Sequence, residues 1–248
     1  MAESKDNTTY YLIAAAAVAA FFVVRKFTAA PSAPPALPGE QAALTGGDRG
    51  GAAPVAAAAS ASQGAPLDLK GQRVLLVGSS STLMIEKDLK AALLAEGVAE
   101  FRNVGVGGTT IRQWSDNKFD VGKTLEAELA SYKPSLVIII LGTNDEGARQ
   151  TRYNGPTYDV AKANVKSVAR FKRKLEGVRS IFVGMPKPDL WPLDRNFRDM
   201  LAATWGPDFF RTEDLGLQKA GDKLHLSPSG YKNLVAALIP CFRQKKKS

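Results

Sequence analysis

The single histidine of this 248-residue chain, His225, stands where it could do acid–base chemistry. Imidazole is the side chain that exchanges a proton most readily near neutral pH. Asp222 precedes it by three residues, and a local turn can bring a carboxylate at that spacing to the imidazole Nδ1. Such a carboxylate fixes the tautomer and leaves Nε2 facing a nucleophile. A lone histidine is also common as an ordinary surface or core residue. Whether His225 is catalytic therefore depends on whether the chain also holds a nucleophile and oxyanion donors.

A serine that could be the nucleophile follows the first predicted strand. The apolar run 73–77 ends in Gly78-Ser79-Ser80-Ser81-Thr82 and passes into an amphipathic stretch that predicts a helix over 82–96. A hydroxyl at a helix N-terminus lies beside free backbone N–H groups that can receive an oxyanion. Ser79, Ser80 and Ser81 all remain candidates, and the register after Gly78 favours Ser80.

Two further strand ends carry suitable turns. The segment 103–108, Asn-Val-Gly-Val-Gly-Gly, follows the second predicted strand, and Gly142-Thr143-Asn144-Asp145 closes the apolar run 135–141. Glycine allows a backbone N–H to approach a substrate closely, and an asparagine amide can donate to an oxyanion. Each turn alone is common after a strand, so the combination and order of the segments carry the prediction.

Together and in this order, the four segments resemble the SGNH (GDSL-type) hydrolase family, over about residues 70 to 243. That family has Gly-Asp-Ser after the first strand, Asn-x-Gly-x-x-Gly after the second, Gly-x-Asn-Asp after the third and Asp-x-x-His near the C-terminus. The chain departs from the pattern at Ser79, where the family has Asp. That Asp is not the carboxylate of the catalytic triad, so the departure removes no catalytic group.

The resemblance implies a serine esterase that works through an acyl-enzyme. Ser80 would be the nucleophile, His225 the base and Asp222 the carboxylate that orients the imidazole. The oxyanion would be bound by the backbone N–H groups of Ser80 and Gly108 and by the side-chain amide of Asn144. The chain has one cysteine and no Cys/His cluster, so we expect neither a cofactor nor a metal.

The order of elements predicts an α/β fold. Strands alternate with helices, which favours a parallel sheet covered on both faces. The resemblance adds a flavodoxin-like three-layer fold with five strands in the order 2-1-3-4-5. The motifs would then meet at the carboxyl ends of the strands. The predicted strands are 73–77, 99–104, 135–141, 178–184 and 208–212, and the predicted helices are 82–96, 123–132, 157–176, 193–204 and 228–243.

Residues 1–27 predict a membrane anchor. The run 10–24 holds 15 uncharged, mostly apolar residues, at the short end for a bilayer span. A cleaved signal peptide with small residues at 28–30 is the alternative and would make the protein secreted. We favour an uncleaved single-pass anchor because Arg25 and Lys26 follow the apolar run, the wrong flank for a secretory signal. The flanking charges do not decide the side of the membrane.

Residues 28–67 are rich in Ala, Pro and Gly and predict a flexible linker, and 68–248 form the hydrolase domain with a basic tail. The net charge of +9 belongs to this domain, since the first 67 residues hold four basic and four acidic residues. The basic residues of 162–174 and 243–247 are either solvated or attract an anionic partner, lipid head groups or an acidic polysaccharide. We expect no nucleic acid, because no recognised binding motif accompanies the charge.

The substrate is less well defined by the sequence. Trp191, in a proline-rich loop after the fourth strand, is expected to line the pocket, with Arg149 and Tyr153 on the opposite wall. Short loops between the motifs favour a small acyl group, such as acetyl on a carbohydrate. The alternatives are an SGNH-type O-acyltransferase on a saccharide, a lipase or thioesterase, or a non-catalytic binding or structural module that kept the fold.

Overall fold

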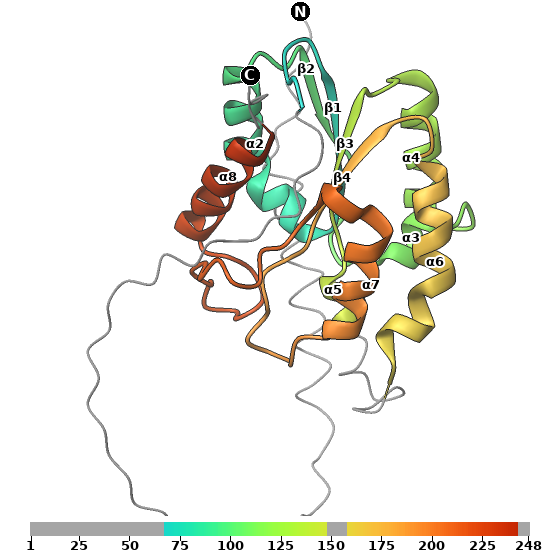
Figure 1. Cartoon of the computed structure of the whole chain (residues 1–248), viewed down its shortest axis with the longest axis vertical. Coiled ribbons are helices and arrows are strands. Elements are labelled where there is room, and N and C mark those ends of the chain that lie inside the picture. The colour runs from blue at the N-terminus through green and yellow to red at the C-terminus, as the bar shows by residue number, and fades with distance from the viewer. Residues whose placement is uncertain (1–66, 148–157, 243–248) are drawn as a thin grey trace, which may run out of the picture. The chain divides into compact units, whose positions relative to one another are not determined.

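The computed structural model describes residues 67–147 and 158–242. Within them, five parallel strands form one sheet in the order β2-β1-β3-β4-β5 (Figure 1). This is the flavodoxin-like order, so the predicted sheet is confirmed. The strands are β1 (Arg73–Gly78), β2 (Glu100–Asn103), β3 (Leu136–Ile140), β4 (Arg179–Val183) and β5 (Phe209–Phe210).

Helices cover both faces of the sheet and complete three layers (Figure 1). One face carries α2 (Ser80–Ala95) and α8 (Pro228–Phe242), which pack against each other. On the other face lie α4 (Asp120–Ser131), α6 (Val160–Lys174) and α7 (Arg195–Trp205). Three short helices complete the described elements: α3 (Ile111–Ser115), α5 (Thr143–Gly147) and the 3-10 helix η3 (Gly206–Asp208).

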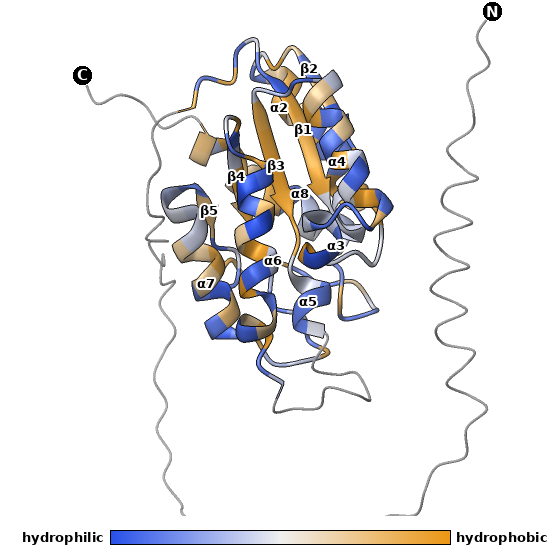
Figure 2. Ribbon diagram, turned by 90° about the vertical axis from the view of Figure 1, so that its right-hand side faces the viewer, coloured by the Kyte–Doolittle hydropathy of each residue, from blue (hydrophilic) through white to orange (hydrophobic). Residues whose placement is uncertain are grey.

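Alternate residues of the central strands supply two separate cores. Leu76 and Ile138 point to the α2 and α8 side, while Leu75 and Val137 point to the other side. Successive side chains of a strand face opposite ways, so a strand covered on both faces must be apolar throughout. All five residues of β3 are buried, and Figure 2 shows β3 and most of β1 in the colour of hydrophobic residues.

The observed start of α2 differs from the predicted one, and two short helices were not predicted. α2 begins at Ser80, two residues before the predicted start at 82, so that Ser80 lies in the first helical turn. A run of serine and threonine is typical of a turn, because their hydroxyl groups compete with the helix for hydrogen bonds to the backbone. The sequence therefore predicts a later start of the helix. α3 and α5 were not predicted, since five residues are too few to show a helical period.

The predicted anchor over 1–27, the linker over 28–67 apart from its last residue, and the basic tail over 243–247 lie outside the described residues. In residues 67–147 and 158–242, no helix is both long enough and apolar enough to cross a bilayer.

We predict that Gly78→Ala destabilises the domain. A Cβ at Gly78 would lie 2.2 Å from the backbone oxygen of Ile140 in the neighbouring strand, which cannot move without shifting β1 from β3. Such overpacking costs about 1–3 kcal/mol of unfolding free energy, which a urea titration measures. Gly221→Ala is the control, because a Cβ there meets no atom within 4 Å. Equal urea midpoints for both variants would contradict the prediction.

Candidate active site

Ser80, His225 and Asp222 form one chain of hydrogen bonds. Ser80 Oγ lies 2.8 Å from His225 Nε2, and His225 Nδ1 lies 2.6 Å from Asp222 Oδ2. Ser80 and His225 are 145 residues apart in the sequence, so only the fold brings them together. The imidazole therefore has the serine hydroxyl on one nitrogen and the carboxylate on the other, an arrangement suited to taking a proton from the serine.

The start of α2 distinguishes the three neighbouring serines. Ser79 and Ser81 are only 2% and 4% exposed, whereas Ser80 is partly exposed and contacts His225. Ser80 is the first residue of α2, with Ser79 as the N-cap. The first N–H groups of an α-helix have no acceptor within the helix. Of the three candidates, Ser80 therefore combines access, an imidazole partner and nearby N–H donors.

A tight turn sets the distance between Asp222 and His225. Asp222 Oδ1 accepts hydrogen bonds from the backbone N–H groups of Leu224, at 3.0 Å, and His225, at 2.9 Å. Lys223 between them has a positive φ of 59°, which a non-glycine residue adopts seldom. Its carbonyl accepts a hydrogen bond from Asp189 N at 2.9 Å, so the proline-rich loop supports the turn.

The same hydrogen bonds keep Asp222 ionised. Partial burial by itself raises the pKa of this carboxyl. The hydrogen bonds from the His225 ring and from the two backbone N–H groups outweigh that effect and hold the pKa below its ordinary value. Asp222 is thus a carboxylate at neutral pH and can orient the imidazole and stabilise its charged form.

The glycine-rich turn after β2 lies directly beside Ser80. Val106 N donates to Gly78 O at 2.9 Å, and a Cβ on Gly107 would lie 3.9 Å from Ser80 Cβ. Gly108 is exposed and has a φ of +76°, a conformation that glycine adopts without strain. The turn therefore places exposed glycine backbone next to the serine.

The short helix α5 supplies an amide to the same region. Asn144 Nδ2 donates to the backbone oxygen of Thr109 at 2.9 Å. The next residue, Asp145, accepts a hydrogen bond on Oδ2 from Ile111 N at 3.1 Å. These two contacts join the segment after β3 to the turn after β2. Asn144, Gly108 and Ser80 are thereby brought to one edge of the sheet.

Sequence reasoning missed three buried charged residues behind this edge. Asp145 and Glu146 are 2% and 1% exposed, and Arg198 of α7 is 3% exposed and hydrogen bonded to Glu146. A signal for Arg198 was present, because it follows buried Phe197 and precedes buried Leu201 on the apolar side of an amphipathic helix.

Burial dominates the titration of the two carboxyl groups. It raises the pKa of Asp145 to about 7, although hydrogen bonds from backbone N–H groups oppose the shift. It also raises the pKa of Glu146, against the hydrogen bonds and positive charge of Arg198. The helix α5 therefore carries two carboxyl groups whose ionisation costs free energy.

The predicted pocket residues have different outcomes. Trp191 is partly buried and packs against the end of α5, since a Cβ on Gly147 would lie 3.1 Å from the indole ring. The indole Nε1 is buried and has no hydrogen-bond partner in the structure. Arg149 and Tyr153 lie outside the described residues. In the described ranges, no group of three or more His, Cys, Asp and Glu is arranged to hold a metal ion.

The chain matches no family model and no curated protein sequence. Solved structures to which it is similar include SGNH hydrolases and esterases. A protein from Slackia heliotrinireducens, provisionally assigned as an SGNH hydrolase, is 19% identical, with 71% of this chain and 100% of that chain covered and a TM-score of 0.48.

Two esterases have a comparable sequence identity and the same TM-score. A psychrotrophic esterase from a Pseudoalteromonas species is 17% identical over 67% of this chain and 93% of its own, with a TM-score of 0.48. A catalytic mutant of an acetylxylan esterase from Geobacillus stearothermophilus is also 17% identical, over 70% of this chain and 94% of its own, with a TM-score of 0.48. The activities of these proteins do not carry over to the chain at such similarity.

We predict that Asp145→Asn stabilises the protein more at pH 8 than at pH 5. A carboxyl whose pKa is raised to about 7 favours folding below its unfolded pKa of 3.8, and this contribution is lost as the pH rises through 7. The loss amounts to at most about 1.4 kcal/mol per pH unit. Asparagine does not ionise, so urea titrations should show the gap between variant and wild type widening with pH.

Asp116→Asn is the control for this titration. The hydrogen bond from the backbone of Lys118 helps to lower the pKa of Asp116, so this substitution should not produce the widening. A constant difference between Asp145→Asn and wild type from pH 5 to pH 8 would show that Asp145 does not titrate in this range.

Proposed function

We propose that the protein is a serine esterase of the SGNH type that hydrolyses a carboxylic ester through an acyl-enzyme. The observation that carries the proposal is the hydrogen-bonded chain from Ser80 Oγ through the imidazole of His225 to the carboxylate of Asp222. A hydroxyl, a base and an orienting carboxylate in this geometry form the unit required for nucleophilic acyl transfer.

In the first half of the reaction, Ser80 Oγ attacks the ester carbonyl carbon while His225 Nε2 takes the hydroxyl proton. The tetrahedral intermediate then expels the alcohol, which receives this proton from the imidazolium. In the second half, His225 takes a proton from water, whose oxygen attacks the acyl-enzyme. The second tetrahedral intermediate then releases the acid, and Ser80 Oγ receives the proton from the imidazolium. Asp222 keeps the imidazole in one tautomer and stabilises its charge in both halves.

Three donors are proposed for the oxyanion: the backbone N–H groups of Ser80 and Gly108 and the amide of Asn144. The amide nitrogen carries two hydrogens, of which one is bonded to Thr109, so a second is available for the intermediate. Each such donor lowers the barrier by roughly 2.7–4 kcal/mol in a measured enzyme. Ser80 is also the first residue of α2, and the dipole at the N-terminus of a helix favours negative charge.

For the substrate, we propose an ester with a small acyl group, such as an O-acetyl group on a carbohydrate. Support comes from the short turns around Ser80 and from Trp191 at the end of α5. An indole ring offers a flat apolar surface to a sugar ring.

We predict that Ser80→Ala abolishes hydrolysis of p-nitrophenyl acetate and labelling by a fluorophosphonate, because no nucleophile remains. His225→Ala should lose about as much activity as Ser80→Ala, since the two side chains act as a unit. Ser79→Ala and Ser81→Ala are matched controls and should keep most of the activity and the labelling. Persistent labelling of the Ser80→Ala protein would move the nucleophile to another residue.

We also propose that residues 1–27 tether the enzyme to a membrane. The full-length protein should then stay with the membrane fraction after carbonate or high-salt washing and enter solution only with detergent, because burial of about 15 apolar residues exceeds any charge-based attachment. N-terminal sequencing should find the first residues retained. Extraction by salt alone, or a mature N-terminus near residue 30, would contradict the anchor and indicate a secreted enzyme instead.

A further inference from the structure

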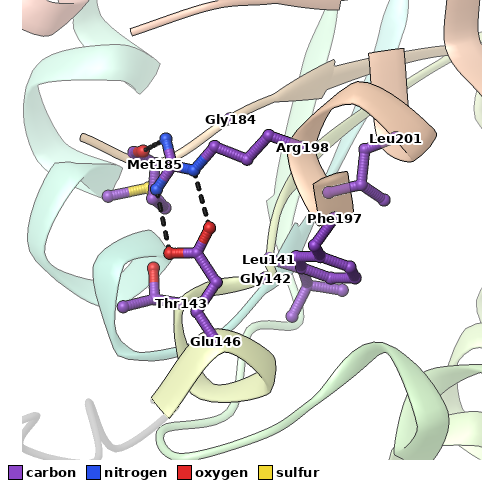
Figure 3. Close-up of a pocket in the computed structure, with 9 residues that line it drawn as sticks. All are labelled: Leu141, Gly142, Thr143, Glu146, Gly184, Met185, Phe197, Arg198 and Leu201. Carbon is purple, nitrogen blue, oxygen red and sulfur yellow. Dashed lines mark hydrogen bonds and ion pairs between the residues drawn. The ribbon is translucent and has the colours of Figure 1, made fainter. Parts of the chain in front are cut away.

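The guanidinium group of Arg198 is buried behind the candidate site and paired at two points with one carboxylate. Its Nε lies 2.7 Å from Glu146 Oε1 and its Nη2 lies 3.1 Å from Glu146 Oε2. Figure 3 shows the two side chains pointing toward each other between α7 and α5. Two parallel hydrogen bonds fix direction as well as distance, so this pair constrains the orientation of α5.

The same guanidinium holds two other segments. Arg198 Nη1 donates to the backbone oxygen of Met185, which follows β4, and lies 3.5 Å from Oε2 of Glu213, which follows β5. Together with Glu146 after β3, Arg198 contacts the segments that follow three neighbouring strands. One side chain on α7 thus ties together the loops along one edge of the sheet.

A buried ion pair contributes little net free energy to folding compared with apolar residues of similar volume. Replacement of such a pair by apolar residues of similar volume is often neutral or stabilising, because the charges lose their hydration. The neighbouring buried positions of α7 are apolar, including Phe197 and Leu201. An apolar side chain would suit this face of the helix, so the pair is better explained by the geometry that it imposes.

The geometry concerns α5, which has only five residues and cannot be stable alone. Three consecutive residues are anchored to three different elements. Asn144 bonds to Thr109 O, Asp145 accepts from Ile111 N, and Glu146 binds Arg198. The first two anchors lie in the segment that follows β2, and the third lies on α7.

We propose that the Arg198–Glu146 ion pair is a positioning device that holds the Asn144 amide toward the oxyanion. This inference rests on the proposed esterase function. Arg198 and Glu146 act through Asn144 and do not touch the reacting atoms. An interaction that matters only when the oxyanion forms lowers kcat and leaves KM nearly unchanged.

The test is a comparison of the full-length protein with its Arg198→Met/Glu146→Leu variant, in the wild-type and in the Asn144→Ala background. Removal of both charges together leaves neither one buried and unpaired. With p-nitrophenyl acetate, kcat should fall by about 10- to 100-fold, below the 10²–10³-fold lost with a whole donor. KM should change by less than about threefold. In the Asn144→Ala background, the same double substitution should lower kcat by no more than about twofold.

A matched control pair lies at the other end of β4. Arg179 Nη2 and Asp208 Oδ1 are 2.9 Å apart, and Arg179 is the first residue of the strand, away from the candidate site. Arg179→Met/Asp208→Leu should leave kcat unchanged.

Near-UV circular dichroism shows whether the Arg198→Met/Glu146→Leu variant is folded. If it is not, Glu146→Gln replaces it with the same expectations, because glutamine keeps the shape of the side chain and loses its charge.

Three results would overturn the proposal. They are an unchanged kcat in the folded variant, an equal fall of kcat with and without Asn144, and an effect on KM alone. Failure of the esterase function is recognised separately: Ser80→Ala would then retain turnover. If Ser80 is required and the charge-pair variant keeps its kcat, only the positioning role is wrong.

Discussion

The parallel pairing of β1 with β3 is the constraint on which the candidate site depends. Gly78 lies opposite Ile140 in the register, and both strands end at this point. A Cβ at Gly78 would lie 2.2 Å from Ile140 O, so the two chains approach as closely as a glycine allows. The segments that follow, with Ser80 after β1 and Asn144 after β3, therefore leave the sheet side by side.

Charge is distributed unequally around this edge. The carboxylate of Asp222 is half exposed and ionised, whereas Asp145 and Glu146 are buried and have raised pKa values. The pKa values of these carboxyl groups thus shift in opposite directions because their surroundings differ. The exposed group is the one in contact with His225, where a negative charge stabilises the imidazolium. The buried groups hold backbone and guanidinium groups in place.

The sheet could be predicted from the sequence because the signals for strands and helices lie in consecutive residues. A continuous apolar run such as 136–140 and an amphipathic helix such as 160–174 show their burial in residue order. The residues Ser80, Asp222, His225 and Asn144 were singled out from the order of short motifs, and the structure brings them to one edge of the sheet. Their catalytic roles remain predictions. The membrane anchor over residues 1–27 also remains a prediction.

What could not be predicted depends on contacts between distant segments. Helices α3 and α5 are too short to show a period, and their positions depend on hydrogen bonds such as that from Ile111 to Asp145. The left-handed backbone of Lys223 follows from support by Asp189 and has no glycine to signal it. The partner of Arg198 lies 52 residues away, so a charge on an apolar helix face indicated burial without naming the carboxylate.

The sequence separation of 145 between Ser80 and His225 also has a consequence for the order in which the protein folds. The ribosome delivers the serine 145 residues before the histidine, which comes just before α8. Since α2 and α8 pack side by side, closing this long loop and completing the α2 face of the core are one event. A nascent chain in which His225 has not yet been made therefore carries Ser80 without its imidazole partner, and the hydrogen bond between the two forms only when the fold is complete.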